Sequence, residues 1–223
     1  MFRARIASDL ADQELSESAR RGMLKAMIRR LDDLQTDYAG LEMTAEEYFA
    51  LGETQERYEL IDGVVRMSPG PLPVHGAIVA EVTGQIWHYL QTHPVGRIFP
   101  ELDVHLGQGP TGGDLVYRPD ILFLRAERVK ANCLRVVDAP DVVVEVISPS
   151  SRRFDRQRKK ADYERFGVGE YWVFDPEDDT VDFFRLLQGG YVDVFPDGDF
   201  LTSKAIPGFV LNLARVRMAS RLD

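Results

Sequence analysis

The sequence predicts a mixed α/β domain preceded by a helical segment. Apolar runs of strand length recur from about residue 58 onward, and two long stretches between them have helical periodicity. No repeat or low-complexity linker interrupts this order after residue 40. Hydrophobic residues make up 44% of the 223 residues, which is enough for the core of one domain.

The first 40 residues differ from the rest of the chain. They contain no Pro and are rich in Ala, Arg, Asp, Glu and Leu. Four apolar residues recur there at helical spacing: Leu24, Met27, Ile28 and Leu31. We therefore expect an N-terminal helical extension over residues 1–40 and a domain over residues 41–218. The extension either packs on its own domain or in a dimer, or it binds another protein.

A short helix and a hairpin open the domain. Thr44 and Glu47 have the spacing of a capping box, which predicts a helix that starts after Thr44. Two short apolar runs within residues 58–67 flank Asp62-Gly63, a dipeptide that favours the tight turn of a β-hairpin.

Residues 75–93 predict a core helix, because apolar side chains recur on one face and Pro94 stops the pattern. The face consists of Ile78, Val82, Ile86 and Leu90. The remaining elements are, in order, strands over 97–106, 117–125 and 140–148, a charged helix over 152–166 ended by Gly167, a strand over 170–175 and a hairpin over 181–194.

Two carboxylates interrupt apolar strands. Glu145 lies in the middle of DVVVEVISP, a run typical of a strand buried on both faces, and Asp120 leads directly into the apolar run of YRPDILFL. A buried carboxylate is costly unless it is paired or holds a metal ion. If these strands pair antiparallel with residue numbers summing to 265, Asp120 lies opposite Glu145 and Arg125 opposite Pro140. A divalent cation between the carboxylates would offset their repulsion.

The charged helix begins just beyond the Glu145 strand. Asp155, Lys159 and Tyr163 share one of its faces at i, i+4 and i+8. A metal held by Asp120 and Glu145 would activate water and neutralise a scissile phosphate, and an adjacent lysine would stabilise the developing charge. The set predicts metal-dependent phosphodiester hydrolysis.

Pro119-Asp120 followed by Glu145 on the next strand resembles the PD-(D/E)xK nuclease superfamily, although Ile147 stands where that motif has its lysine. This departure, together with YELIDG, VVVEVISPSSRRFD, Lys159-xxx-Tyr163 and GVGEYWVFDP, resembles the Uma-two family of restriction-endonuclease-like proteins. In that family the following helix supplies the lysine. The resemblance covers about residues 43–213.

The resemblance implies a restriction-endonuclease-like three-layer core with a mixed central β-sheet flanked by helices. It implies Mg²⁺ dependence, with Mn²⁺ as a substitute, and an endonuclease acting on nucleic acid, DNA in preference to RNA, as a homodimer. Asp120, Glu145 and Lys159 match the catalytic set, with Asp120 and Glu145 as metal ligands. Glu59 and His75 match an acidic position on the first strand and a histidine at the core helix, where either could act beside the metal ligands or at a second metal.

The role of four other residues near the expected site has two interpretations. Asp155 either caps its helix or orients Lys159 together with Tyr163. Arg152, Arg153 and Arg156 either contact substrate phosphates or form the solvated face of their helix, and the net charge of −9 weakens the first reading.

Two further function classes remain open. The fold could serve as a catalytically silent binding or scaffold module, or the site could hydrolyse a small phosphate ester in a closed pocket. The start of the chain lacks the apolar segment of a signal peptide, and no stretch has the length of a membrane span. With a single cysteine, Cys133, these features predict a cytoplasmic protein without a membrane partner.

Overall fold

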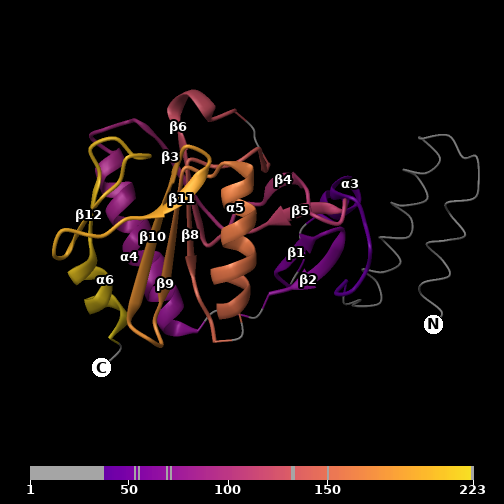
Figure 1. Ribbon diagram of the computed structural model, residues 1–223, viewed down its shortest axis with the longest axis horizontal. Helices are drawn as coiled ribbons and strands as arrows, with labels where there is room; N and C mark the ends of the chain where they lie inside the picture. The colour runs from indigo at the N-terminus through magenta and orange to yellow at the C-terminus, as the bar shows by residue number, and fades with distance from the viewer. Residues whose placement is uncertain are drawn as a thin grey trace, which may run out of the picture.

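The computed structural model of the chain describes residues 38–221, apart from residues 53, 55, 69, 71, 132, 133 and 150. A six-stranded mixed sheet forms its centre (Figure 1). In spatial order its strands are β11 (Gly190–Asp193), β10 (Thr180–Leu187), β9 (Glu170–Asp175), β8 (Val142–Val146), β6 (Ile121–Arg125) and β3 (Gly96–Pro100). Within this sheet β8 and β9 pair in parallel and the other neighbours pair antiparallel, so the mixed central sheet expected from the sequence is confirmed.

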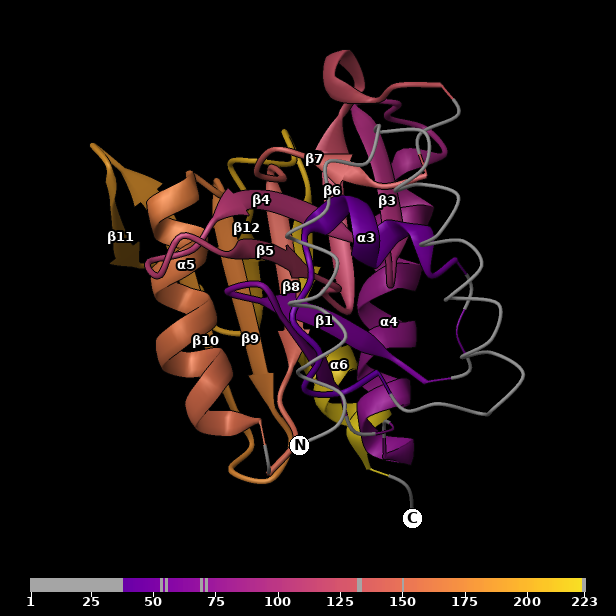
Figure 2. The same ribbon diagram turned by 90° about the vertical axis from the view of Figure 1, so that its right-hand side faces the viewer.

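Helices cover both faces of this sheet (Figure 2). Helices α4 (Pro73–Leu90) and α6 (Leu213–Ser220) pack against one face, through the apolar stripe of α4 that the sequence predicts. A π-helical segment, η2 (Phe154–Lys159), continues into α5 (Lys160–Phe166) on the other face. The expected three-layer core is therefore confirmed.

A second, five-stranded sheet lies on the α5 side of the central sheet (Figures 1 and 2). Its order is β2 (Val64–Met67), β1 (Tyr58–Ile61), β5 (Asp114–Tyr117), β4 (Val104–Gln108) and β7 (Val136–Val137). Helix α3 (Ala45–Ala50), which has the expected Thr44 to Glu47 capping box, packs on this sheet. Three short elements complete the fold: η1 (Ala126–Arg128), β12 (Phe200–Thr202) and β13 (Val210–Asn212).

The second sheet corrects two expected strands. Residues 97–106 divide between β3 and β4, and residues 117–125 begin with the last residue of β5 and continue as β6, so neither range is one continuous strand. Glu101 has a φ of 50°, which breaks the first run, and Pro119, which lacks a backbone donor, lies between the strands of the second run. The chain crosses between the sheets at these two breaks.

Residues with positive φ form the turn of the hairpin and end the charged helix. Asp62 and Gly63 have φ values of 52° and 77°, as a tight hairpin turn with two left-handed residues requires, and β1 pairs with β2 around them. Gly167 ends α5 with a φ of 89°, a conformation that favours glycine.

The expected helical extension over residues 1–40 lies outside the described residues except at its last three positions. Tyr38 is already buried against Tyr58. None of the helices that the structure describes is both long and apolar enough to cross a bilayer.

Candidate active site

The two strand carboxylates lie side by side on the face of the central sheet that meets α5. Strand β6 pairs antiparallel with β8 so that Ile121 lies opposite Val144, and this register has residue numbers summing to 265. The expected register is therefore confirmed, although the ladder ends at Phe123 instead of reaching Arg125. Both carboxylates are buried, with 3% of Asp120 and 4% of Glu145 exposed.

Asp120 has a hydrogen-bond partner for each oxygen. Its Oδ2 accepts the Val146 N–H at 2.7 Å and lies 3.1 Å from His75 Nε2, near the start of α4. Its Oδ1 lies 3.1 Å from both Nη1 and Nη2 of Arg57. Burial alone would raise the pKa of Asp120, but His75, Arg57 and the Val146 N–H together hold that pKa below its usual value.

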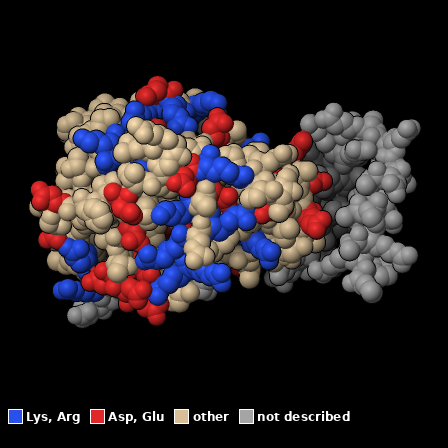
Figure 3. Space-filling view, in the orientation of Figure 1, with Lys and Arg blue, Asp and Glu red and all other residues tan. Residues whose placement is uncertain are grey.

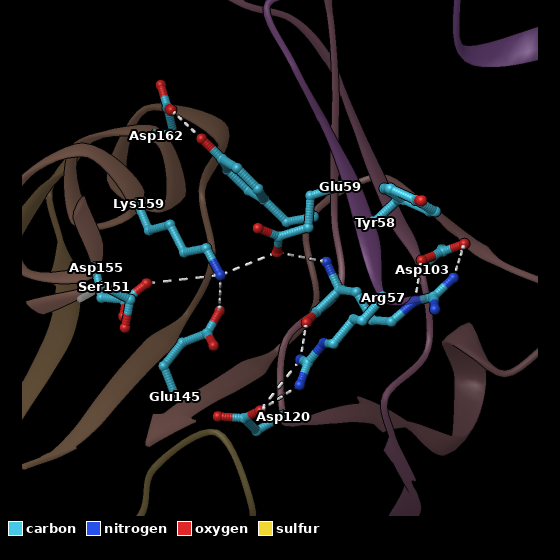
Figure 4. A network of polar contacts seen from close by, with 12 residues as sticks. Arg57, Tyr58, Glu59, Asp103, Asp120, Glu145, Ser151, Asp155, Lys159 and Asp162 are labelled. Carbon is cyan, nitrogen blue, oxygen red and sulfur yellow. Dashed lines mark hydrogen bonds and ion pairs between the residues drawn. The ribbon is translucent and has the colours of Figure 1, made fainter. Parts of the chain in front are cut away.

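Lys159 lies at the centre of a buried cluster of acids (Figure 4). Its Nζ is 2.9 Å from Glu145 Oε1, 3.0 Å from Glu59 Oε1 and 3.6 Å from Asp155 Oδ1. The Tyr163 hydroxyl donates to the same Glu145 oxygen at 2.9 Å. Burial would lower the pKa of Lys159, yet the three carboxylates raise that pKa well above its usual value. Lys159 is therefore a fixed cation.

The pKa of Glu145 is raised as well, which for a carboxylate disfavours the charged form. Burial raises the pKa of Glu145 to about 8 against the opposing charge of Lys159, and the negative charges of Asp120, Asp155 and Glu59 add to the increase. Burial likewise raises the pKa of Asp155. The cluster thus holds more carboxylates than its cations neutralise.

The π-helical turn positions the side chains from the helix. Asp155 and Lys159 lie within η2, and Tyr163 follows one turn later in α5. All three face β8, as the i, i+4, i+8 spacing predicts. Of the two readings for Asp155, the structure favours the partner of Lys159, because its backbone is inside the helix and not at the cap. π-Helical turns of this kind often occur at functional sites.

The three helix arginines for which phosphate contact was one of two interpretations pair with other side chains instead. Arg152 pairs with Asp175, Glu177 and Asp178, at 2.8, 2.8 and 3.0 Å. Arg156 pairs with Asp175 and Asp182, and Arg153 bonds Gln157. None of these three arginines lines the pocket described below. Lys and Arg gather over the middle of the face that α5 presents, but Asp and Glu are intermixed with them (Figure 3).

Two arginines that lie at the candidate site were not predicted from the sequence. Arg57, which holds Asp120, immediately precedes β1 and no periodicity marks it. Arg158 links the hairpin to the helix, since its Nη2 lies 2.8 Å from Asp62 Oδ2 and its Nε 2.5 Å from Asp162 Oδ2. Tyr117 also donates to Asp162, at 2.6 Å. The alternating charges of the helix gave no indication of which arginine faces the hairpin.

The cluster forms the floor of a pocket of about 1040 Å³. The hairpin β1–β2, the start of α4, the end of β8 and η2 contribute its walls. Arg57, Arg66 and Arg158 supply positive charge there, while Met67 and Leu72 present exposed apolar side chains. The pocket therefore combines a buried acidic floor with basic and apolar walls.

The donor set fits a magnesium ion held by two carboxylates. Four buried acids, Glu59, Asp120, Glu145 and Asp155, face two fixed cations, Arg57 and Lys159, so negative charge is in excess. Glu145 Oε2 accepts no hydrogen bond from the described residues. Within the same residues no group of three His, Cys, Asp or Glu side chains could hold an ion. Mg²⁺ often uses one or two carboxylates and keeps several waters, which suits Asp120 and Glu145.

The fold and this site define a restriction-endonuclease-like α/β protein. The chain belongs to the Uma2 family, described as "Putative restriction endonuclease", whose sequence model matches residues 45–214. It is similar to a crystal structure from Anabaena variabilis of a "putative nuclease belonging to DUF820", with a TM-score of 0.68 and 23% sequence identity. The similarity covers 80% of this chain and 99% of the other. The comparison with curated proteins gives no match.

Proposed function

We propose that the chain is a metal-dependent endonuclease that hydrolyses phosphodiester bonds in nucleic acid, DNA in preference to RNA. One observation carries this proposal. Lys159 reaches Glu145 from the following helix, beside Asp120, although Ile147 occupies the usual place of the lysine. Two acids and a lysine, the set proposed for phosphodiester hydrolysis, therefore line the floor of one pocket. Family membership supports the same reading.

Each side chain of the cluster has a proposed role. Asp120 and Glu145 would hold Mg²⁺, with Mn²⁺ as a substitute. The bound ion would supply a Lewis acid for the phosphate and would lower the pKa of a water molecule. Lys159 stabilises negative charge that develops on the attacked phosphate, because burial among acids keeps it protonated. Tyr163 fixes the Glu145 carboxylate, and Glu59 and Asp155 fix the Lys159 ammonium.

Cleavage assays test the proposal. The protein is incubated with plasmid, single-stranded DNA and RNA, each with Mg²⁺, Mn²⁺ or a chelator. Asp120→Asn and Glu145→Gln should lose the metal-dependent cleavage, while Glu177→Gln, which changes an exposed carboxylate at the rim of the same pocket, should keep it.

The assays also separate the rival functions. Metal binding without cleavage of any nucleic acid, combined with hydrolysis of a chromogenic phosphodiester, would indicate a small phosphate ester as substrate. Neither metal binding nor cleavage would indicate a scaffold in which the cluster is only a charge network. The pairing of Asp120 and Glu145 with protein cations favours this scaffold reading over the small-ester reading.

We also propose that the chain is cytoplasmic, on the ground of its single cysteine, and that it forms a homodimer, on the ground of the family resemblance and the helical extension predicted over residues 1–40. Light scattering of the purified full chain tests the dimer. A monomeric mass at micromolar concentration would contradict it.

A further inference from the structure

Arg57 occupies the carboxylate oxygen that the proposed metal needs. Its Nη1 and Nη2 each lie 3.1 Å from Asp120 Oδ1, and Nη2 also donates to the Arg118 carbonyl. A guanidinium and a divalent cation repel each other strongly when they share one oxygen. A metal ion that binds at Asp120 Oδ1 must therefore displace Arg57.

Asp120 does not depend on Arg57 for its position. The Val146 N–H and His75 hold the other oxygen, Oδ2, at 2.7 and 3.1 Å. The Val146 donor belongs to the backbone of a central strand, so it does not move with a side chain. The carboxylate consequently stays in place when Oδ1 is released.

The Arg57 side chain is also held by groups other than Asp120, since Nη1 lies 3.5 Å from Glu101 Oε1 and Nη2 donates to the Arg118 carbonyl. Its backbone carbonyl accepts the Ser68 N–H at 2.8 Å, which fixes the main chain beside the hairpin. The side chain lines the pocket and remains 18% exposed. Its Nε is buried and has no hydrogen-bond partner among the described residues. An arginine binds a phosphate through two parallel N–H bonds, which would use such a donor.

We propose that Arg57 transfers from Asp120 to a phosphate of the nucleic acid, and that this exchange opens Asp120 to the divalent cation. The inference rests on the function proposed above. Arg57 then has two roles, since it binds substrate and it keeps metal affinity low until substrate is present. The consequence is that nucleic acid and metal bind cooperatively, and each must raise the affinity for the other by the same factor.

Calorimetry measures this coupling directly. Mn²⁺ is titrated into the wild-type protein and Arg57→Gln, each with and without a 12-nucleotide single-stranded DNA that carries phosphorothioate linkages to slow its cleavage. The matched control is Arg66→Gln, which removes another arginine of the same pocket that makes no contact with Asp120. A second arm uses RNA of the same sequence.

The wild type should bind Mn²⁺ about tenfold more tightly when the oligonucleotide is present, a factor typical of coupled sites. Arg57→Gln should bind Mn²⁺ more tightly than the wild type without oligonucleotide, and the oligonucleotide should no longer change that affinity. Arg66→Gln should retain the wild-type coupling. Arg57→Lys keeps the positive charge but loses the two parallel N–H donors of the guanidinium. Without oligonucleotide it should bind Mn²⁺ as weakly as the wild type does, and the oligonucleotide should raise that affinity by a smaller factor.

The contrary results distinguish a failure of the Arg57 exchange from a failure of the proposed nuclease function. The exchange would be overturned if the oligonucleotide did not change the Mn²⁺ affinity of the wild type, or if it changed the affinity of the wild type and of Arg57→Gln equally. Either result would leave the nuclease proposal standing. If Arg57→Gln does not fold, as judged by circular dichroism, Arg57→Lys decides the question in the same way. No Mn²⁺ binding by the wild type in any condition would overturn the metal-dependent nuclease itself.

Discussion

Lys159 Nζ lies 2.9 Å from Glu145 Oε1, although the two residues belong to different elements and are 14 positions apart. In the sequence motif that Glu145 resembles, the lysine is two positions away on the same strand. Here that position is Ile147, which is buried in the apolar core between the sheet and α5. The helix therefore supplies to the site the charge that the strand cannot supply.

Removing the buried cation should destabilise the fold. Lys159→Met leaves Glu145, Glu59 and Asp155 without their common partner, and breaking a buried ion pair costs about 3–5 kcal/mol. Urea unfolding at pH 7 measures this loss. Lys160→Met is the matched control, because Lys160 lies over the Phe184 ring and should cost about 1 kcal/mol. Equal losses in the two variants would contradict the central position of Lys159.

The metal-free protein should lose stability as pH rises from about 5 to 8. The pKa of Glu145 is raised from its usual 4.5 to about 8, so the folded protein binds one more proton than the unfolded chain between these values. The free energy of unfolding then falls with pH, by up to about 1.4 kcal/mol per pH unit for one proton. Urea unfolding at several pH values measures the slope. Glu145→Gln should flatten it, and an unchanged slope would assign the proton to another group.

Asp120 should affect the stability of the fold over a separate, lower pH range. Because its folded pKa lies below the usual 3.8, its contribution to stability is present above that value and is lost as pH falls further. Asp120→Asn should therefore reduce the acid sensitivity below pH 4. Because the charge of Asp120 also helps to raise the pKa of Glu145, the same variant should narrow the upper pH range in which Glu145 acts. A change confined to the upper range would contradict the low pKa.

The Tyr163 hydroxyl should tune metal affinity. Tyr163→Phe removes one of two hydrogen bonds to Glu145 Oε1, and loss of such a partner typically lowers metal affinity 10–100-fold. Calorimetric titration with Mn²⁺ measures the effect. Tyr191→Phe is the control, because its hydroxyl bonds the Val168 carbonyl away from the pocket. Both variants should lose about 1 kcal/mol of stability, but only Tyr163→Phe should lose affinity.

Gly167 should contribute to stability only through its backbone conformation. Its φ of 89° is unfavourable for other residues, and a methyl group there would meet no atom closer than 4.0 Å. Gly167→Ala should therefore cost about 1–2 kcal/mol through conformation and not through a clash. Gly84→Ala, inside α4 with no atom within 4 Å, should instead stabilise the protein by about 0.5–1 kcal/mol. Thermal unfolding distinguishes the two signs.

Much of the candidate site could be predicted because its signals are local. A carboxylate in an apolar strand is conspicuous, so Asp120 and Glu145 stand out, and their register follows from matching two apolar segments end to end. The helical spacing of Asp155, Lys159 and Tyr163 is equally visible. Arg57 and Arg158 carried no such signal, because an arginine beside polar residues looks the same whether it faces solvent or a buried acid.

The sequence by itself determined the mixed α/β class, the core helix, the turn positions and the face that carries Lys159. These follow from periodicity and backbone preferences, which act over a few residues. Only the tertiary structure decided that residues 97–106 and 117–125 divide between two sheets, and that Arg152 and Arg156 are neutralised by acids from β9, β10 and the turn between them. Such pairings depend on which distant segments meet when the core packs, and no local pattern encodes that meeting.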